Sequence, residues 1–424
     1  MAVEATTSAR RKVVIVGGGF AGLTAATKLA KADVDVTVLD RHNYHCFQPL
    51  LYQVATAELS PADIAWPIRH VLRRQKNARV LLGDVTAIDV EGRKVVADTG
   101  TFEFDELILA TGARHSYFGN DDWEKSAPGL KRIEDATIIR RRLLMAFERA
   151  ELSENPAERE SLLTFAIVGA GPTGVELAGA IIEVARQVMP SEFRHIDPRT
   201  ARVILIEAGP RVLPAFPEAL TDYTRRSLEK MGVEVMTDTR VTHVDDKGVD
   251  LANGRLDAAT VIWAAGVIAS PAGRWLGAET DRAGRVIVQP NLTVPGHENI
   301  FVVGDTATAK RPDGQDVPGV APAAKQMGAY VADVIASRVR GAVPPPAFHY
   351  RHQGDVATIG RRSAVIKMPY MNLTGFTAWL VWCVAHIYFL IGARNRIAVA
   401  FKWVWDFMTF QRGARLITDQ RDQI

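Results

Sequence analysis

Cysteine is scarce in this chain: its 424 residues include only two, Cys46 and Cys383, which lie far apart in the sequence. No Cys-x-x-Cys motif occurs, which argues against a dithiol redox centre and a zinc ribbon, and we expect no metal site. An excess of one charge is also absent, since a formal net charge of +3 is too small to predict binding to nucleic acid. Residues 1–12 lack the apolar run of a secretory signal. We therefore expect a cytosolic globular protein.

A glycine-rich turn follows the first predicted strand. Residues 12–16 read Lys-Val-Val-Ile-Val, residues 17–22 read Gly-Gly-Gly-Phe-Ala-Gly, and a helical pattern comes next. In this context a Gly-x-Gly-x-x-Gly turn brings a dinucleotide pyrophosphate to the N-terminus of the helix. A second predicted strand, 34–39, ends in Asp40, close to the spacing of about 20 residues expected for a ribose-binding carboxylate. The sequence therefore predicts a Rossmann-type dinucleotide site.

The same pattern occurs a second time. Residues 165–168 form an apolar strand, residues 169–174 read Gly-Ala-Gly-Pro-Thr-Gly, and a later strand ends in Glu207. The longer spacing to this acid is explained by a loop insertion at 190–199. A carboxylate here favours NADH over NADPH, because a 2′-phosphate would meet a negative charge, although Arg211 lies nearby in sequence. Two sites indicate two dinucleotides, and FAD with NAD(P)H is the natural pair because hydride passes between them.

Three further segments resemble those of flavoproteins with two dinucleotide-binding domains. Residues 107–112 read Leu-Ile-Leu-Ala-Thr-Gly, like the turn that closes the first half of the FAD domain in that superfamily. Residues 261–266 look like the counterpart of this turn in the NAD domain. Residues 300–305 end in Gly-Asp, and the resemblance implies that Asp305 hydrogen-bonds the ribitol chain of the flavin.

Within that superfamily the chain resembles the type II NADH dehydrogenases, single-subunit NADH:quinone oxidoreductases, over nearly its whole length. The most specific segments are 43–55 (Asn-Tyr-His-Cys-Phe-Gln-Pro-Leu-Leu-Tyr-Gln-Val-Ala), 171–179 (Gly-Pro-Thr-Gly-Val-Glu-Leu-Ala-Gly) and 318–326 (Pro-Gly-Val-Ala-Pro-Ala-Ala-Lys-Gln). That family often carries Ala-Gln where this chain has Ala-Pro at Pro322, so the first glutamine associated with quinone contact is missing. Sulfide:quinone oxidoreductases and disulfide reductases need cysteine pairs that this chain lacks.

The resemblance implies an α/β fold with two Rossmann-type dinucleotide-binding domains, for FAD and NADH, and a C-terminal amphipathic helical membrane-attachment region. We expect the FAD to be non-covalent, because no histidine or cysteine lies in an obvious attachment motif for flavin. The resemblance places the carboxylate of Glu176 near the nicotinamide and the flavin. The alternative for this residue is an acid that complements the helix dipole. The site residues expected on this basis are Gly17, Gly19, Phe20, Ala21, Gly22, Asp40, Arg41, Val85, Ala110, Thr111, Gly112, Gly304, Asp305 and Ala321 for FAD, Gly169, Gly171, Pro172, Thr173, Gly174, Glu207, Ala265 and Gly266 for NADH, and Gln326 and Lys367 for quinone.

The expected domains follow the order of the motifs. Residues 1–120 and 281–346 are expected to form the FAD-binding domain, 121–280 the NADH-binding domain and 347–424 the membrane-anchoring region. A run of three prolines ending at Pro346 marks the last boundary. Both glycine motifs precede this point, so we expect a chain cut there to keep the step from NADH to flavin.

The C-terminal region differs in composition from the rest of the chain. From His349 onward basic residues outnumber acidic ones, and four of the eight tryptophans lie there. Residues 373–391 carry no formal charge, and residues 397–410 combine aromatic side chains with Lys402 and Asp406. Three interpretations stay open: one transmembrane helix, a buried helix at a dimer interface, or helices that lie in one leaflet of an anionic membrane surface, as the resemblance implies.

The sequence thus predicts a respiratory-chain enzyme that passes electrons from NADH through FAD to a membrane quinone. No charged relay across a membrane is visible, so we expect no proton pumping and a monotopic location on the cytoplasmic face of the inner (cell) membrane. Formation of a homodimer is left open. The alternatives are a soluble flavoprotein reductase of a small iron–sulfur protein and a membrane-attached NADH-binding sensor flavoprotein.

Overall fold

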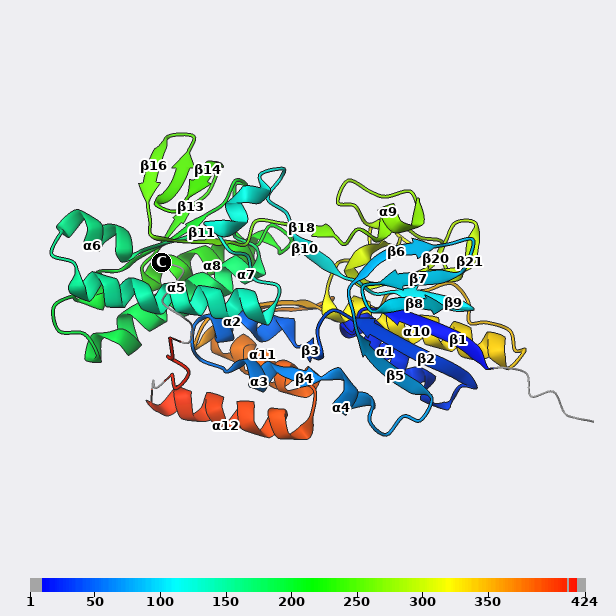
Figure 1. The fold of residues 1–424 in the computed structure, drawn as a ribbon. Coiled ribbons are helices and arrows are strands. Elements are labelled where there is room, and N and C mark those ends of the chain that lie inside the picture. The colour runs from blue at the N-terminus through cyan, green and yellow to red at the C-terminus, as the bar shows by residue number, and fades with distance from the viewer. Residues whose placement is uncertain (1–9, 410–411, 418–424) are drawn as a thin grey trace, which may run out of the picture. The chain divides into compact units, whose positions relative to one another are not determined.

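The structure of the protein is a computed structural model that describes residues 10–409 and 412–417 (Figure 1). The chain folds into two compact units. The first unit contains residues 10–45, 66–114 and 267–353. The second contains residues 46–65, 115–266 and 354–417. Each unit contains a mainly parallel sheet whose first Rossmann strand leads into a glycine turn and a helix, so the predicted α/β class is confirmed.

A six-stranded sheet forms the centre of the first unit. Its order is β20-β21-β9-β1-β2-β5, and all neighbours are parallel except β20 and β21. Its strands read as β-branched runs because both faces of a parallel sheet are covered. The bounds are β1 Arg11–Val16, β2 Val34–Asp40, β5 Ala78–Leu82, β9 Glu106–Leu109, β20 Thr293–Val294 and β21 His297–Val302.

Helices α1 (Phe20–Lys28) and α10 (Ala321–Val339) pack against each other beside this sheet (Figure 1). Gly328 permits the close approach, because a Cβ atom there would lie 2.1 Å from the carbonyl oxygen of Ala21. A smaller antiparallel sheet holds β6, β7 and β8. Other elements of this unit include α4 Ile68–Leu72, β6 Val85–Asp89, β7 Lys94–Ala97, β8 Gly100–Glu103, β18 Val267–Ala269, α9 Ala272–Leu276, β19 Val286–Ile287 and β22 Ala307–Thr308.

A four-stranded parallel sheet, β13-β12-β11-β17, forms the centre of the second unit. Helix α7 starts directly after β11 and is apolar on most of its surface, so it is buried against this sheet. The elements up to this sheet's last strand are α2 Leu51–Ala55, α3 Pro61–Ile64, α5 Ile133–Leu152, α6 Pro156–Leu162, β11 Thr164–Val168, α7 Pro172–Glu183, β12 Arg202–Ile206, α8 Glu218–Met231, β13 Val233–Met236 and β17 Thr260–Trp263.

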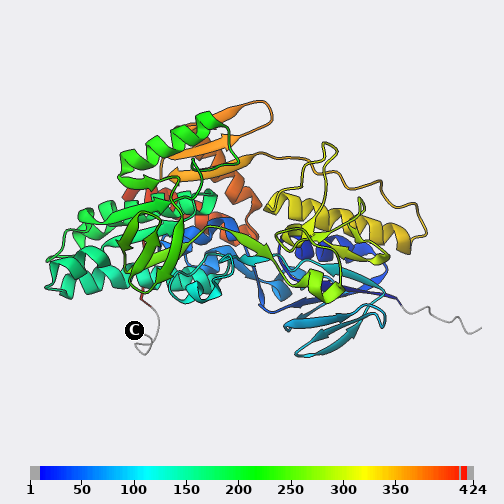
Figure 2. The same ribbon diagram turned by 90° about the horizontal axis from the view of Figure 1, so that it is seen from above.

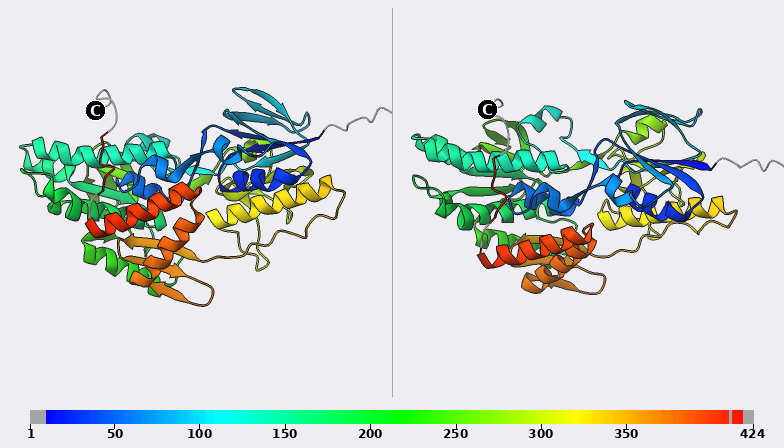
Figure 3. Two further views of the ribbon diagram at one scale, coloured as in Figure 1. Left: turned by 90° about the horizontal axis from the view of Figure 1, so that it is seen from below. Right: turned by 60° about the horizontal axis from the view of Figure 1, so that its bottom comes forward.

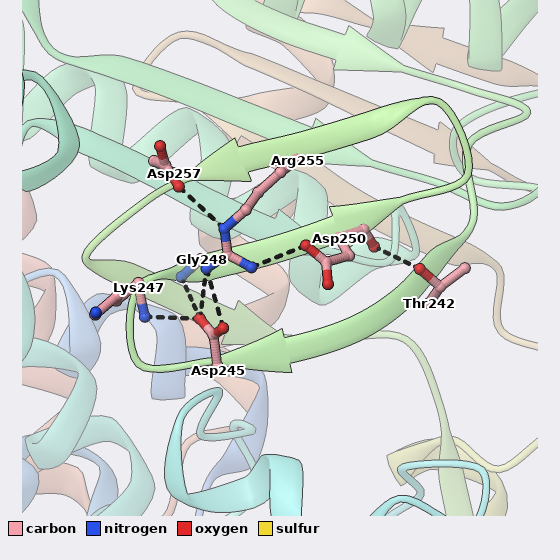
Figure 4. A network of polar contacts seen from close by, with 7 residues as sticks. All are labelled: Thr242, Asp245, Lys247, Gly248, Asp250, Arg255 and Asp257. Carbon is pink, nitrogen blue, oxygen red and sulfur yellow. Dashed lines mark hydrogen bonds and ion pairs between the residues drawn. The ribbon is translucent and has the colours of Figure 1, made fainter.

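An antiparallel excursion of β14 (Val241–Asp245), β15 (Gly248–Leu251) and β16 (Gly254–Asp257) carries a surface charge network. The guanidinium of Arg255 donates hydrogen bonds to the carboxylates of three aspartates (Figure 4). The donor–acceptor distances are 2.8 Å for Asp245, 2.8 Å for Asp250 and 3.1 Å for Asp257. Because these groups are solvent-exposed, the network stabilises the excursion only weakly.

The C-terminal region packs on α7 and α8 of the second unit (Figure 2). A Cβ atom at Gly179 of α7 would lie 1.8 Å from the carbonyl oxygen of Ile359, so α7 and β23 are in direct backbone contact. This packing argues against the expectation that a chain cut at Pro346 keeps the NADH half intact. The antiparallel sheet that begins this region was not predicted from the sequence. Its elements are β23 Asp355–Gly360, β24 Ser363–Lys367, β25 Asn372–Thr374, α11 Gly375–Phe389 and α12 Ala393–Thr409.

Helices α11 and α12 confirm the predicted C-terminal helices. In Figure 3 the red α12 runs beside blue α2 and α3 of the same unit, and Lys402 of α12 pairs with Asp63 of α3 at 3.1 Å. Among the described residues, none of the helices combines the length and the apolar character needed to cross a bilayer. The expected domain boundaries, which name a ligand for each part, stay a prediction; residues 46–65 and the C-terminal region group with the second unit.

Candidate functional site

The first glycine turn, between β1 and α1, has the geometry that its motif predicts. Gly17 has a φ of +102°, and a Cβ atom there would lie 2.3 Å from the carbonyl oxygen of Ala110. At Gly22 a Cβ atom would lie 1.9 Å from the oxygen of Gly17, whereas at Gly19 it would meet open space. The loop is therefore closed on the protein side and open where a pyrophosphate would approach. These residues fit a bound dinucleotide.

A cavity of 240 Å³ opens beside this turn in the first unit. Asp40, at the end of β2, accepts hydrogen bonds from the backbone N–H of Gly18 at 2.5 Å and of His42 at 2.7 Å. Its carboxylate thus lies at the turn, where a ribose hydroxyl would bind. The cavity is lined by five of the residues expected for FAD, namely Gly17, Asp40, Arg41, Val85 and Thr111.

The two later flavin motifs meet at one point of the first unit. The hydroxyl of Thr306 donates to the carbonyl of Gly112 at 3.2 Å, and Thr111 lies 3.3 Å from the same hydroxyl. This contact joins the Ala-Thr-Gly turn to the turn that holds Gly304 and Asp305. Residues almost 200 positions apart are therefore brought together as the resemblance implies, although their contact with flavin stays a prediction.

The second glycine turn repeats this geometry in the second unit. Gly169 has a φ of +101°, and its Cβ atom would lie 2.5 Å from the Cα of Ala265. Glu207 accepts hydrogen bonds from the N–H of Ala170 at 2.7 Å and of Gly209 at 2.8 Å. Glu207 is thus the counterpart of Asp40 on the other sheet. The guanidinium of Arg211 instead donates to the carbonyl of Pro214 at 3.3 Å.

Glu176 lies in the second turn of α7 and borders a second cavity, of 60 Å³, within the second unit. Burial raises the pKa of its carboxyl to about 8, against a weak opposing hydrogen bond of 3.5 Å from the N–H of Thr358. The acid is therefore neutral at pH 7. We refer to this cavity as the acidic chamber, and it is lined by Tyr52, Gln53, Glu58, Glu176, Ala180, Glu183, Gln187, Val188, Thr358, Gly360, Arg361, Trp379, Trp382, Cys383, Trp403, Asp406, Phe407 and Arg412.

Sequence reasoning missed most of the charged residues of this chamber. Glu183 follows Glu176 by two helical turns, and Arg412 donates to its carboxylate at 3.2 Å. Two acids seven positions apart on an otherwise apolar helix were the available signal, because this spacing places them on one face. Arg412 also donates to the carbonyl of Thr56 at 3.1 Å and lies 3.9 Å from Glu58.

The two residues predicted for quinone are already engaged by protein groups. The amide of Gln326 exchanges two hydrogen bonds of 2.9 Å with the backbone of Arg351 in the first unit. Lys367, in the second unit, pairs with Asp355 at 3.4 Å and donates to the carbonyl of Ala215 at 3.3 Å. Neither lines the acidic chamber, and their contact with quinone stays a prediction.

Comparison with known proteins gives a consistent result. Residues 11–328 match the family of pyridine nucleotide-disulphide oxidoreductases, and residues 352–412 match the NDH2 C-terminal domain. Two proteins of Mycobacterium tuberculosis, both named type II NADH:quinone oxidoreductase, are 49% and 47% identical to the chain. The alignments cover 97% of this chain and 90% and 91% of theirs. The chain belongs to the type II NADH:quinone oxidoreductase family. The resemblance stated from the sequence is thereby confirmed.

The solved structure of NDH2 from Plasmodium falciparum in complex with NADH has the same fold as this family member. It aligns with a TM-score of 0.85 at 21% identity, over 97% of this chain and all of that one. A sulfide:quinone oxidoreductase of Aquifex aeolicus aligns with a TM-score of 0.74 at 20% identity. These similarities establish the fold alone, and the functional distinction comes from the relatives of higher identity.

Proposed function

We propose that this chain is a membrane-associated NADH:quinone oxidoreductase that uses FAD and moves no proton across the membrane. The observation that carries the proposal is the pair of glycine turns, in each of which a carboxylate accepts a hydrogen bond from a loop amide. In addition, the chain is 49% identical over 97% of its length to a protein named type II NADH:quinone oxidoreductase. An enzyme that used NAD alone would need only one such turn. A reductase of an iron–sulfur protein and a sensor are not favoured, because the curated relatives carry the quinone name.

The chain's own residues bind and orient the two dinucleotides. FAD, when bound, supplies the two-electron chemistry between nicotinamide and quinone. The amides at the start of α1 and α7 and the positive ends of these helices favour pyrophosphate. Asp40 and Glu207 are placed to accept hydrogen bonds from ribose hydroxyls, and Glu207 disfavours a 2′-phosphate by its charge.

Glu176 is proposed as the catalytic acid. A neutral carboxyl holds a proton, and a positive charge that forms nearby, as on oxidised nicotinamide, favours release of that proton by lowering its pKa. The residue therefore serves better as a proton donor than as a fixed negative charge while no nicotinamide cation is present.

Helices α11 and α12 are proposed to lie in the bilayer interface on the cytoplasmic face. They expose large apolar side chains beside Arg394 and Arg396, a combination suited to an anionic lipid surface. Such an area of exposed apolar surface is rare where only water covers it. The exposed apolar residues of the two helices, here called the apolar face, are Phe376, Leu380, Val381, Val384, Tyr388, Ile397, Phe401, Val404, Trp405 and Met408.

The test is NADH oxidation by the protein reconstituted in liposomes, with and without decylubiquinone. We expect oxidation to require the quinone, to be faster with NADH than with NADPH, and to slow in Glu207→Ala at low NADH. Oxidation that a small iron–sulfur protein stimulates and quinone does not would favour the reductase. Binding of NADH without turnover with either acceptor would favour the sensor.

A further inference from the structure

The acidic chamber has the size and the polarity of a site that holds water. Its 60 Å³ has room for roughly four molecules, given about 10–15 Å³ of such volume for each. In the part of the chain that the structure describes, Oδ2 of Asp406 and Nε1 of Trp382 are buried at this chamber without a hydrogen-bond partner. Buried polar atoms are nearly always paired with protein or ordered water, so we assign these partners to water.

Four carboxyl groups and two guanidinium groups line the chamber, drawn from segments far apart in the chain. Arg412 holds Glu183 at 3.2 Å and approaches Glu58 at 3.9 Å. Asp406 of α12 and Glu176 of α7 both line the chamber, and both residues are partly exposed. Acids thus line the chamber on the α12 side as well as beside the proposed catalytic acid.

The proposed reaction needs such a supply. NADH gives up two electrons and one proton as a hydride, whereas a quinone that becomes a quinol takes up two electrons and two protons. The overall equation is NADH + H⁺ + quinone → NAD⁺ + quinol. One proton per turnover must therefore come from water, and a buried acid that gives it up must be reprotonated from solvent.

We propose that the acidic chamber conducts this proton from solvent through Asp406 and enclosed water to Glu176. The inference rests on the proposed function. At each step an O–H bond of the donor breaks as one forms on the acceptor, so no electrons move in the relay. Because the proton enters and is consumed on the same side, the relay pumps nothing.

The protonation equilibria suit a relay near neutral pH. Burial raises the pKa of Asp406 to about 6, with the negative charge of Glu58 adding to the rise and the cations of Lys402, Arg412 and Arg361 opposing it. The acceptor, Glu176, has a pKa of about 8, raised by burial and opposed by the Thr358 hydrogen bond. A proton therefore moves from Asp406 to Glu176 in the favourable direction.

The test separates the two half-reactions in the full-length FAD-loaded protein in liposomes. Rapid mixing with NADH follows bleaching of the flavin, and a second mix with decylubiquinone follows the return of its absorbance. In Asp406→Asn we expect the bleaching of the flavin to be unchanged and the return of its absorbance to be about tenfold slower at pH 8. A positioned acid contributes roughly 10²–10⁴-fold to a rate. The expected effect is smaller because the water in the chamber still conducts protons. Added formate, a small acid, should restore the rate.

Two further variants make the result decisive. Glu58→Gln changes a second chamber acid. Like Asp406→Asn, it should slow the return of flavin absorbance more at pH 8 than at lower pH. Glu192→Gln is the matched control, because Glu192 pairs with Arg415 of the C-terminal segment and does not line the chamber. A return that matches wild type at all pH values in both chamber variants overturns the relay alone. A loss that is equal at all pH values and resists formate also overturns it, since a structural defect behaves in that way. If NADH bleaches the flavin of the wild-type protein but quinone does not restore its absorbance, the proposed function itself is overturned.

Discussion

The indole Nε1 of Trp403 donates a hydrogen bond of 2.9 Å to Oε1 of Gln53, a residue 350 positions earlier in the chain. Both side chains are buried, and Trp382 of α11 packs against the same indole with ring centroids 5.1 Å apart. The C-terminal helices are therefore anchored in the core of the second unit by specific contacts. Their apolar face is a separate surface from this anchored side.

Trp403→Ala should destabilise the second unit. Loss of a buried indole costs about 3–5 kcal/mol of unfolding free energy, and the amide oxygen of Gln53 loses the hydrogen bond from Trp403. Trp403→Phe is the matched control, because it keeps an aromatic ring in place of the indole and should destabilise the unit less than Trp403→Ala, although it loses the same hydrogen bond to Gln53. Urea titration followed by circular dichroism measures both. Equal stability of Trp403→Ala and wild type would show that α12 is not anchored in this way.

Asp40 and Glu207 should have separable roles, because they hold different glycine turns. Asp40→Ala should lower the flavin retained per chain after purification. Glu207→Ala should leave flavin bound, raise KM for NADH and weaken rejection of NADPH. Loss of either partly buried acceptor costs ~1–3 kcal/mol, or roughly 5- to 150-fold in affinity. Flavin absorbance and steady-state kinetics measure these effects, and equal flavin loss in both variants would contradict the assignment of the sites.

The apolar face should control membrane binding without affecting the nucleotide sites. Phe401→Ser combined with Met408→Ser removes two side chains that are 69% and 75% exposed, so the folded core loses little. We expect the protein to shift toward the soluble fraction in liposome sedimentation, with flavin content unchanged. Leu152→Ser is the control, because Leu152 is 82% exposed at the end of α5. A control that reduced sedimentation as much as the double variant would argue against a specific face.

Glu176 should make the protein less stable as pH rises. Its folded pKa of about 8 exceeds the ordinary value of 4.5, so the folded state binds more protons than the unfolded state between these values. Unfolding free energy should therefore fall from pH 5 to pH 8. Glu176→Gln removes part of this slope, whereas Glu218→Gln, a change in the first turn of α8, should leave it intact. Urea titrations at pH 5 and 8 measure the slope, and an identical slope in Glu176→Gln would contradict the buried neutral acid.

The sequence predicted the parts of the site that are local in the chain. Each glycine turn is specified by a strand, a few glycines and a carboxylate at the end of the next strand, and the packing of Gly17 and Gly169 follows from that pattern. The acidic chamber could not be predicted in the same way. Glu58, Arg361 and Asp406 come from segments without a common motif and meet only through tertiary packing.

The quinone residues illustrate the same limit. Gln326 matched a family position, yet its amide is satisfied by the backbone of Arg351, a partner that no local pattern predicts. The β23–β24–β25 sheet was not predicted because its strands are short and lie between a proline run and an apolar helix. The composition of this region predicted membrane attachment and carried no signal for a sheet.

The stoichiometry of the reaction distinguishes electron transfer from NADH to quinone from every other fate of NADH. The FAD-loaded protein in liposomes is mixed without oxygen with limiting NADH and excess decylubiquinone in lightly buffered solution, and NADH, quinol and pH are followed together. We expect one quinol to form and one proton to be taken up for each NADH consumed, with no proton gradient across the membrane. NADH consumption without matching quinol would contradict it.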